Sequence, residues 1–468
     1  MNLKLVVASM SILGLVSCPV FAATHAKKHH HMKKHHRMMK HQKNEVAYHD
    51  YKDMGSLPIQ PAPVACTISQ ANMVLAMSSQ NLGRMANPCN PGWFNRIQFS
   101  GGINVDVGKW GRTTAFMGEN YQRLSLNDAH LDVTATVNDW TKAFASISYN
   151  TATINDPIIA VLGEHVAEYS AAYDNNANGG ANHTLQLEQA YVTLGNVDQM
   201  PVYVQVGKQF QDFSRYPLHP ITRSMTQVMS ETLATSAKIG FVANGFNGSL
   251  AVFDNPTPKI GQTKRPTDYV ASLGFGQAGD QMGWDLGIGY MYDLNGVNDV
   301  AYNTTQFNLA NAAIAARGFN RRTSGVALYG DVNSGPFMVG ARWTTATSRF
   351  NVNDLPKNGI ADIVAATGAP LADATGARPW AAGITAGFVF DPIFGCHKNN
   401  IYVGYQASRE AAGLNLPRSR WLAGYEFDYW KSTKFGIEWD RDIAYSVARG
   451  GTGNNSNLVS LRAGVEFG

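Results

Sequence analysis

Long hydrophobic runs, charged residues and cysteines are all scarce in this chain of 468 residues. A helix that crosses a bilayer needs about 18 or more apolar residues in a row, and the only sustained apolar run, Leu5–Val16, is too short. Charged residues make up 15% of the chain, and the mean hydropathy is only −0.19. A helical membrane protein is therefore excluded, and no phosphate loop, nucleic-acid-binding pattern or cysteine-based metal motif is found.

Residues 1–22 have the pattern of an export signal. The apolar run follows a positive charge at Lys4 and precedes a small-residue cleavage site at Val20-Phe21-Ala22. A second interpretation is a lipobox at Leu15-Val16-Ser17-Cys18, which would leave Cys18 as a lipidated N-terminus. Both interpretations predict that the chain leaves the cytoplasm.

Residues 23–65 are rich in His, Lys and Met and cannot bury a core, so we expect them to be disordered. Imidazole groups suit Zn, Cu, Ni and Fe, so capture of a divalent metal is one interpretation of this tail. A solvated basic tail that touches anionic lipid or cell wall is another, and an expression tag is a third. The histidines that would hold a metal are His29, His30, His31, His35 and His36. No cofactor is otherwise expected.

Residues 66–95 are expected to form a short helical segment, either in the periplasm or in the mouth of a barrel. Cys66 and Cys89 could form a disulfide in an oxidising periplasm. Closing so short a loop would add about 3 kcal/mol of stability. Cys396 is then left as a free thiol in a turn.

From residue 96 onward, apolar residues recur at every second position, which is the strand period. Trp284, Leu286, Ile288 and Tyr290, for example, alternate with small or polar residues. Sixteen such segments are found, at 96–108, 124–137, 140–149, 185–195, 201–210, 234–244, 246–254, 268–276, 282–293, 323–332, 336–348, 380–390, 400–408, 419–429, 433–443 and 457–467.

The connections between these segments alternate between short and long. Short ones include Asn138-Asp139 and Asn244-Gly245, whereas the long ones are 150–184, 211–233, 255–267, 294–322 and 349–379. Outer-membrane barrels have short periplasmic turns, long external loops and aromatic girdles. The residues expected in the girdles are Trp140, Tyr149, Tyr191, Trp284, Tyr292, Trp380, Trp421 and Trp439.

A soluble sandwich would have shorter strands and would not sort its turns by side. We therefore predict an all-β fold, a transmembrane antiparallel β-barrel of about 16 strands over residues 96–468. Its surroundings would be the lipid and lipopolysaccharide of the bacterial outer membrane. Whether it forms a homo-oligomer is left open.

If the apolar alternates face lipid, the charged alternates face the lumen, because a charge on the lipid face costs about 2–4 kcal/mol at the midplane. Sixteen strands leave an aqueous channel. Arg342, Arg420 and Arg462 are expected to bind an anionic ligand, since guanidinium offers a fixed fork to carboxylates. An alternative is that the lumen charges only pair with one another. The other predicted lining residues are Lys434, Glu426, Glu438 and Asp440.

The long connection Phe213–Ser230 is polar and aromatic and carries Arg215 and Arg223. It is expected either to fold inward as a constriction or to form a lid on the outer surface.

Two stretches carry a family resemblance. One runs from Phe99-Ser100-Gly101-Gly102 to Val137-Asn138-Asp139-Trp140, and the other includes Gly207-Lys208-Gln209-Phe210 and Ser224-Met225-Thr226-Gln227. They resemble a family of outer-membrane barrels from Legionella, Coxiella and Francisella, whose best understood type is the legiobactin siderophore receptor. The resemblance implies a plug-less barrel of sixteen strands that takes up ferric siderophore without the usual energy-coupling box. Residues 23–95 also leave little room for a plug domain.

Four functions are compatible with a barrel: a solute-specific receptor or channel, a general diffusion porin for small polar solutes, a hydrolase, and an adhesin or structural anchor. A hydrolase needs Ser or Asp beside a His at the rim. None of the histidines outside the tail lies in a nucleophile motif, so no enzyme is expected; these are His130, His165, His183, His219 and His397. A channel or receptor for a small solute is the preferred interpretation, without nucleic acid as a partner.

Overall fold

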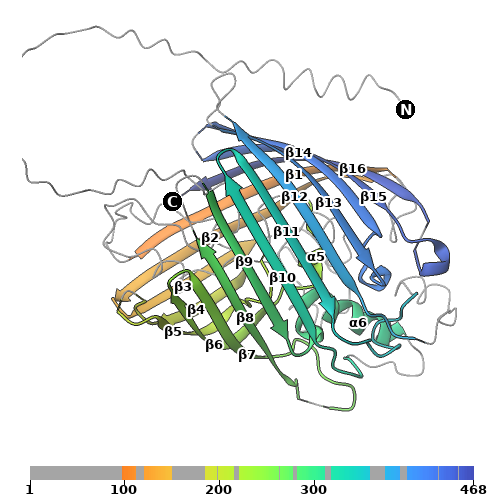
Figure 1. Ribbon diagram of the computed structural model, residues 1–468, viewed down its shortest axis with the longest axis horizontal. Coiled ribbons are helices and arrows are strands. Elements are labelled where there is room, and N and C mark those ends of the chain that lie inside the picture. Colours follow the sequence, from red (N-terminus) through yellow and green to blue (C-terminus); the bar gives the residue numbers. More distant parts are fainter. Residues whose placement is uncertain are drawn as a thin grey trace, which may run out of the picture.

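Sixteen antiparallel strands close into a single barrel (Figure 1). The computed structural model describes residues 97–111, 121–149, 185–197, 199–215, 221–262, 264–277, 282–310, 318–358, 375–390, 398–430, 432–451 and 453–467. The signal, the tail, the 66–95 segment and both Cys66 and Cys89 lie outside these residues. The predicted all-β barrel is confirmed.

Each predicted segment overlaps one strand, and the predicted ends of β7, β12 and β15 are those of the structure. The strands are β1 (Ile97–Gly111), β2 (Tyr121–Asn138), β3 (Thr141–Tyr149), β4 (Leu185–Leu194), β5 (Val202–Phe210), β6 (Leu233–Ala243), β7 (Phe246–Asp254), β8 (Thr267–Gln277), β9 (Met282–Met291), β10 (Gly325–Ser334), β11 (Phe337–Ala346), β12 (Trp380–Phe390), β13 (Lys398–Arg409), β14 (Ser419–Trp430), β15 (Thr433–Ile443) and β16 (Asn455–Phe467).

Every strand pairs with its neighbour in the sequence, and β1 pairs with β16 to close the ring, with Asp106 opposite Arg462. Closure leaves no sheet edge, which a lipid environment demands because it offers no partner to an unpaired backbone group. The β6–β7 hairpin turns at Asn244 and Gly245, with φ of 51° and 84°. Positive φ at both positions is what a tight type I′ turn requires, and Asn-Gly is its preferred sequence.

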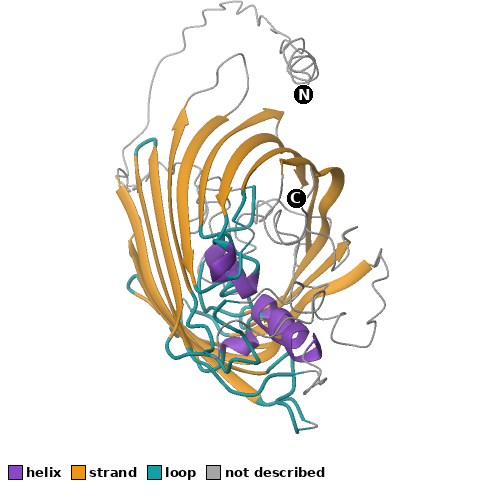
Figure 2. Ribbon diagram, turned by 90° about the vertical axis from the view of Figure 1, so that its right-hand side faces the viewer, coloured by secondary structure: helices purple, strands orange, loops and turns teal. Residues whose placement is uncertain are grey.

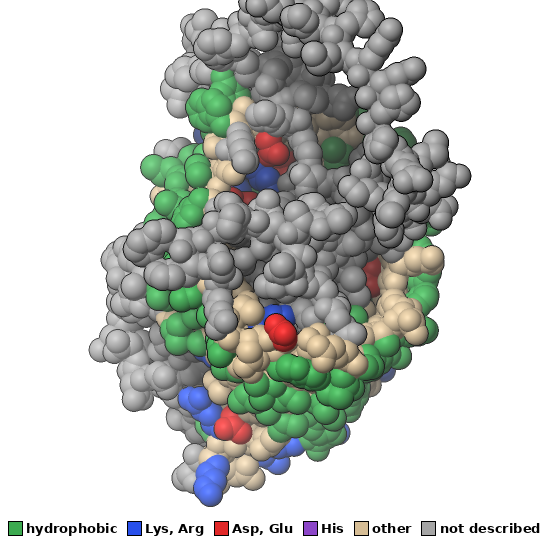
Figure 3. All heavy atoms as spheres, turned by 90° about the vertical axis from the view of Figure 1, so that its left-hand side faces the viewer, with side chains coloured by type: hydrophobic (Ala, Val, Ile, Leu, Met, Phe, Trp, Pro, Cys, Tyr) green, Lys and Arg blue, Asp and Glu red, His purple; other side chains and the backbone are tan. Residues whose placement is uncertain are grey.

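Large apolar side chains cover the outside of the barrel, and Figure 3 shows a broad hydrophobic patch on one such face. They stand at the alternating strand positions that the sequence pattern predicts to face lipid. Examples are Phe99, Ile288, Phe337 and Trp421. A closed barrel with an apolar outer surface matches a transmembrane barrel, whose lipid-facing residues are apolar. The protein therefore belongs in the bacterial outer membrane.

One girdle residue is assigned wrongly by the sequence. Tyr191 is only 3% exposed and faces inward, with its ring 5.3 Å from that of Phe144. The cause is a β-bulge in β4, where Ser146 pairs with Gln189 but Ile147 pairs with Leu187, so that Glu188 is an extra residue. An extra residue reverses the alternation of the strand beyond it, and period two alone cannot reveal that.

The described helices lie in connections between strands, and Figure 2 shows helices within the ring of strands. The helices are α5 (Met225–Val228), η3 (Leu294–Gly296), α6 (Asn298–Ala310), η4 (Ala412–Leu414) and η5 (Val447–Arg449). Among the described helices, none has both the length and the hydrophobicity needed to cross a membrane.

Part of the barrel interior is an apolar core. Loop residues such as Phe213, Met229 and Leu294 pack there against inward-facing residues of the strands. The fully buried ones come from β7–β12, and half-buried Ala234 of β6 packs against them. The fully buried strand residues are Ala251, Phe253, Val270, Met291, Ala327, Ala346 and Ala381. One side of the lumen is therefore filled by apolar packing.

Three inward-facing tyrosines each lie against a glycine that is their direct partner on the adjacent strand. The pairs are Tyr203 with Gly240, Tyr329 with Gly287 and Tyr402 with Gly424. A ring that covers a cross-strand glycine protects the glycine backbone and helps to fix the register. Two of these residues, Tyr329 and Tyr402, also make the contacts with charged side chains described below.

We predict that Gly287→Ala destabilises the folded barrel by about 1–3 kcal/mol, because a Cβ there would overlap the Tyr329 ring. The midpoint of urea unfolding in detergent micelles measures this. Gly383→Ala is the matched control, since its Cβ would meet no ring, and its nearest neighbour is the flexible Gln406 side chain at 3.2 Å. Equal midpoints for the two variants would contradict the ring-on-glycine account.

Candidate functional site

The connection between β5 and β6 is called the inner loop here, and its described residues, 211–215 and 221–232, lie inside the barrel. Its described residues include Phe213, Ile221, Met225 and Met229, all of them buried. The one-turn helix α5 begins after Ser224, whose Oγ accepts a hydrogen bond from the N–H of Gln227, as an N-cap does. The inner loop thus has a defined conformation of its own inside the lumen.

The first anchor of the inner loop is Arg215. Its guanidinium forms an ion pair with Asp285 of β9 and lies over the Tyr329 ring, 4.7 Å from the centroid. Arg342 of β11 donates from Nε to the backbone carbonyl of Arg215 at 2.7 Å and pairs with Asp331 of β10 at 2.8 Å. Three strands thus hold one residue of the loop.

The second anchor is Glu438 of β15, whose side chain is fully buried. Its two oxygens accept hydrogen bonds from the backbone N–H groups of Ile221 (2.7 Å) and Thr222 (2.8 Å). They also accept from the Thr222 hydroxyl (2.7 Å) and the Tyr402 hydroxyl (2.6 Å). One carboxylate therefore satisfies two backbone donors that the loop would otherwise bury without partners.

The third anchor is Arg420 of β14. Its guanidinium forms a two-pronged ion pair with Asp442 of β15, at 2.7 and 2.9 Å, and donates to the carbonyl of Arg223 at 3.1 Å. Next to it, the amide oxygen of Gln406 accepts from the N–H of Met225 at 2.8 Å. Barrel side chains thus hold the loop backbone on both sides of Ser224.

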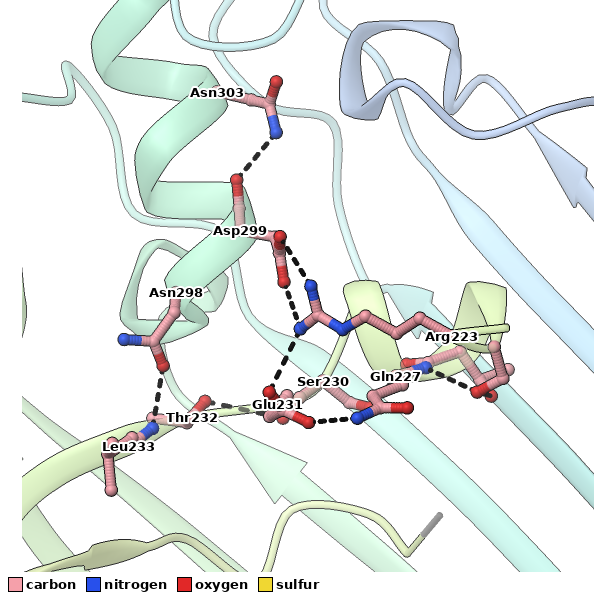
Figure 4. Close-up of polar contacts among 11 residues, drawn as sticks. Arg223, Gln227, Ser230, Glu231, Thr232, Leu233, Asn298, Asp299 and Asn303 are labelled. Atoms are coloured by element: carbon pink, nitrogen blue, oxygen red, sulfur yellow. Dashed lines mark hydrogen bonds and ion pairs between the residues drawn. The ribbon is translucent and has the colours of Figure 1, made fainter. Parts of the chain in front are cut away.

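A fourth contact joins the inner loop to α6 (Figure 4). Arg223 binds Asp299 of α6 at 2.6 Å and Glu231 of the loop at 3.1 Å, and Gln227 donates to Glu231. Asn298 accepts from the N–H of Leu233 at 2.7 Å where the loop enters β6. One buried ion pair, Arg223–Asp299, therefore joins the two long connections.

All seven predicted lining residues lie on the inner face of the barrel. Each of the three arginines already binds an aspartate of the wall, Arg462 through Asp106 at 2.6 Å. Asp440 is fully buried, whereas Glu426, Lys434 and Arg462 are half-buried. Binding of an anionic ligand by the arginines stays a prediction, and the geometry shows them engaged with carboxylates of the barrel itself.

Sequence reasoning missed the partners of these residues. The alternation of apolar and polar residues predicts that three aspartates, Asp331, Asp442 and Asp106, face inward. Their partners depend on the strand register, which the alternation does not give. Tyr402 and Asp299 carried no signal, because tyrosine suits either face and Asp299 lies in a connection.

Within the described ranges, no group of three or more His, Cys, Asp or Glu side chains is placed to hold a metal ion. The five tail histidines lie outside those ranges.

At the external mouth, Asp293 follows β9 and is only 1% exposed. Its Oδ1 accepts from the N–H groups of Asn295 (3.1 Å) and Thr323 (3.3 Å) and from the Asn295 amide (2.8 Å). Burial raises the pKa of Asp293 to about 6, although these donors and nearby Arg322 oppose the shift. The folded state therefore binds a proton more tightly than the unfolded chain does.

We predict that the free energy of unfolding falls as pH rises from about 4 through 6, because the Asp293 pKa is higher in the folded state. The bound proton stabilises the folded state fully at pH values below the pKa that Asp293 has in the unfolded chain. Above pH 6 this stabilisation is lost, and the loss in the free energy of unfolding is at most about 3 kcal/mol. Asp293→Asn should flatten this segment of the profile, measured by urea unfolding from pH 4 to 8. Asp254→Asn, on the exposed face of β7, should leave it unchanged. An Asp293→Asn profile as steep as the wild type would overturn the assignment.

No protein-family model matches the chain. It is similar to a UPF0422 protein of Coxiella burnetii, at 22% identity over 372 residues, covering 79% of this chain and 69% of the relative. It is also similar to a UPF0422 protein of Legionella pneumophila strain Paris, at 25% identity over 368 residues, covering 74% and 62%. The chain thus spans about two thirds of the length of these curated relatives.

Among solved structures, the outer-membrane channel DcaP of Acinetobacter baumannii matches with 13% identity and a TM-score of 0.48, covering 79% of this chain and 97% of DcaP. OmpT of Vibrio cholerae in its trimer form matches with 10% identity and a TM-score of 0.44, covering 79% and 99%. Likeness at this level is a likeness of fold alone. The resemblance to barrels of Coxiella and Legionella is confirmed as similarity to their UPF0422 proteins, while the link to a siderophore receptor stays a prediction.

Proposed function

We propose that the protein is an outer-membrane channel whose inner loop narrows the lumen, so that only small polar solutes pass. The observation that carries this proposal is the anchoring of the inner loop. Buried side chains from β11, β14 and β15 hold its backbone inside the barrel, and Asp285 of β9 holds the Arg215 side chain. A segment held on several walls acts as a fixed partition rather than as a lid that opens.

The filled side of the lumen supports small solutes over bulky ones. Apolar loop and strand residues occupy the interior along β7–β12. A ferric siderophore is a large, polar complex, and its passage would require the anchored loop or this core to move. Uptake of such a complex, which the family resemblance implies, is therefore the second candidate.

Single-channel recording in planar bilayers tests the proposal. We expect small, steady conductance steps that a ferric siderophore does not change, and liposome swelling with sugars of increasing size should show a sharp upper limit. Block of the current by siderophore in a saturable way would favour the specific receptor instead. A folded protein that gives no conductance and no swelling would contradict a channel of either kind.

A further inference from the structure

The inner face of the barrel carries more acidic than basic side chains. Among strand residues whose side chains the structure describes, twelve inward-facing residues are acidic and six are basic. The acidic ones are Asp106, Asp132, Glu188, Asp268, Asp285, Asp331, Glu426, Asp428, Glu438, Asp440, Asp442 and Glu466. The basic ones are Lys142, Lys238, Arg342, Arg420, Lys434 and Arg462.

Most of these basic groups are held in ion pairs. Arg342, Arg420 and Arg462 each bind an aspartate of the wall, and Lys238 binds Asp212 of the inner loop at 2.9 Å. A carboxylate at that distance cancels most of the field that the cation sends into the lumen. Four of the six basic groups are therefore compensated locally, and the inward acidic side chains still outnumber the basic ones by six.

The inner loop does not correct the imbalance. Its described charged residues are two acids, Asp212 and Glu231, and two bases, Arg215 and Arg223. Both arginines point into buried ion pairs, with Asp285 and with Asp299. The described part of the loop therefore adds no net charge.

Half of the excess lies on β14–β16, where six inward residues are acidic and three are basic. Glu426, Asp428 and Glu466 on β14 and β16 are half-buried, so that water and solutes can reach them. The apolar core lies on the other side, along β7–β12. Gln189 and Ser460 carry buried polar atoms without a hydrogen-bond partner in the described part of the chain, so water must satisfy them. The side of the lumen away from the apolar core therefore carries both half-buried carboxylates and polar atoms that water satisfies.

We propose that this lumen selects cations over anions, and that small cationic solutes are its preferred substrates. The inference rests on the proposed channel function. A passage lined by charge of one sign, with low-dielectric walls, concentrates counter-ions and excludes ions of like charge. Glu426, Asp428 and Glu466 are the residues that determine the selectivity, since they are the inward carboxylates of this wall that solutes contact.

The reversal potential across a planar bilayer in a KCl gradient tests the proposal. We expect wild-type channels to pass K⁺ at least about threefold better than Cl⁻, with a larger ratio at lower salt because screening weakens. The triple variant Glu426→Gln, Asp428→Asn, Glu466→Gln should bring the ratio close to one. Asp254→Asn, which removes a carboxylate from the exposed outer face, is the matched control and should keep the wild-type ratio.

The outcomes separate the two proposals. Absence of current from folded barrel overturns the channel function, and the selectivity with it. Current that is unselective or prefers Cl⁻ in the wild type leaves the channel function standing and overturns the selectivity. A triple variant that folds, as gel mobility before and after heating reports, and keeps the wild-type ratio overturns the assignment to these three carboxylates.

Discussion

Glu438→Ala is expected to release the inner loop and to raise the single-channel conductance severalfold. The substitution leaves the buried N–H groups of Ile221 and Thr222 without an acceptor. Each buried donor without a partner destabilises the docked loop by about 1–3 kcal/mol. The two N–H groups can regain hydrogen bonds only if the loop backbone moves into water. The barrel should stay closed, because its strand pairing does not depend on this side chain.

Tyr402→Phe is the graded control for this result, since it removes only one of the four hydrogen bonds to Glu438 and leaves the two backbone donors satisfied. Its conductance should stay close to that of the wild type. Limited proteolysis gives a second measurement, because a released loop becomes a cleavage site in Glu438→Ala alone. A Glu438→Ala channel with unchanged conductance and unchanged proteolysis would show that the loop is held without this carboxylate.

Arg420→Met is expected to cost about 3–5 kcal/mol of folding free energy, because it leaves the buried Asp442 carboxylate without its ion pair. It also removes the donor to the carbonyl of Arg223. Equilibrium urea unfolding in detergent measures the loss. The conductance should rise as well, since one anchor of the inner loop is gone.

A double-mutant cycle distinguishes the ion pair from mere loss of packing. Adding Asp442→Asn to Arg420→Met removes the uncompensated charge, so most of the lost stability should return. The conductance should not return, because the carbonyl of Arg223 still lacks its donor. Additive costs in the double variant would mean that Arg420 and Asp442 stabilise the barrel independently.

Strand positions were predictable because lipid and water impose opposite demands on alternate residues. If the register of β15 shifted by one residue, Glu438 and Asp440 would point into the hydrocarbon of the membrane. The pattern therefore fixes which side chains of β15 face the lumen. The Arg420–Asp442 pair was not readable from the β14–β15 turn, because the register shifts between Asp428 and Trp430. Continued from the Trp430–Thr433 pair, an unbroken ladder would place Arg420 opposite Ile443. The Asp106–Arg462 pair was not readable, because it forms across the closure of β1 on β16 and no turn sets that register.

The interior of the barrel was harder to foresee than its wall. The inner loop was expected to be either a constriction or a lid, and its residues suit both. What places it inside is a set of contacts with strands far along the chain, such as Glu438 and Gln406. Period and composition describe local surroundings, and they contain no information on such distant contacts.

The distance in sequence between the inner loop and Glu438 also sets the order of assembly. Ile221 and Glu438 are 217 residues apart, so the loop can reach its final position only after β15 has joined the wall. Contacts of such long range form late, because the chain entropy lost in closing the intervening segment is repaid only when the strands are in place. We therefore expect docking of the loop to be a late step in folding, after β15 has joined the wall.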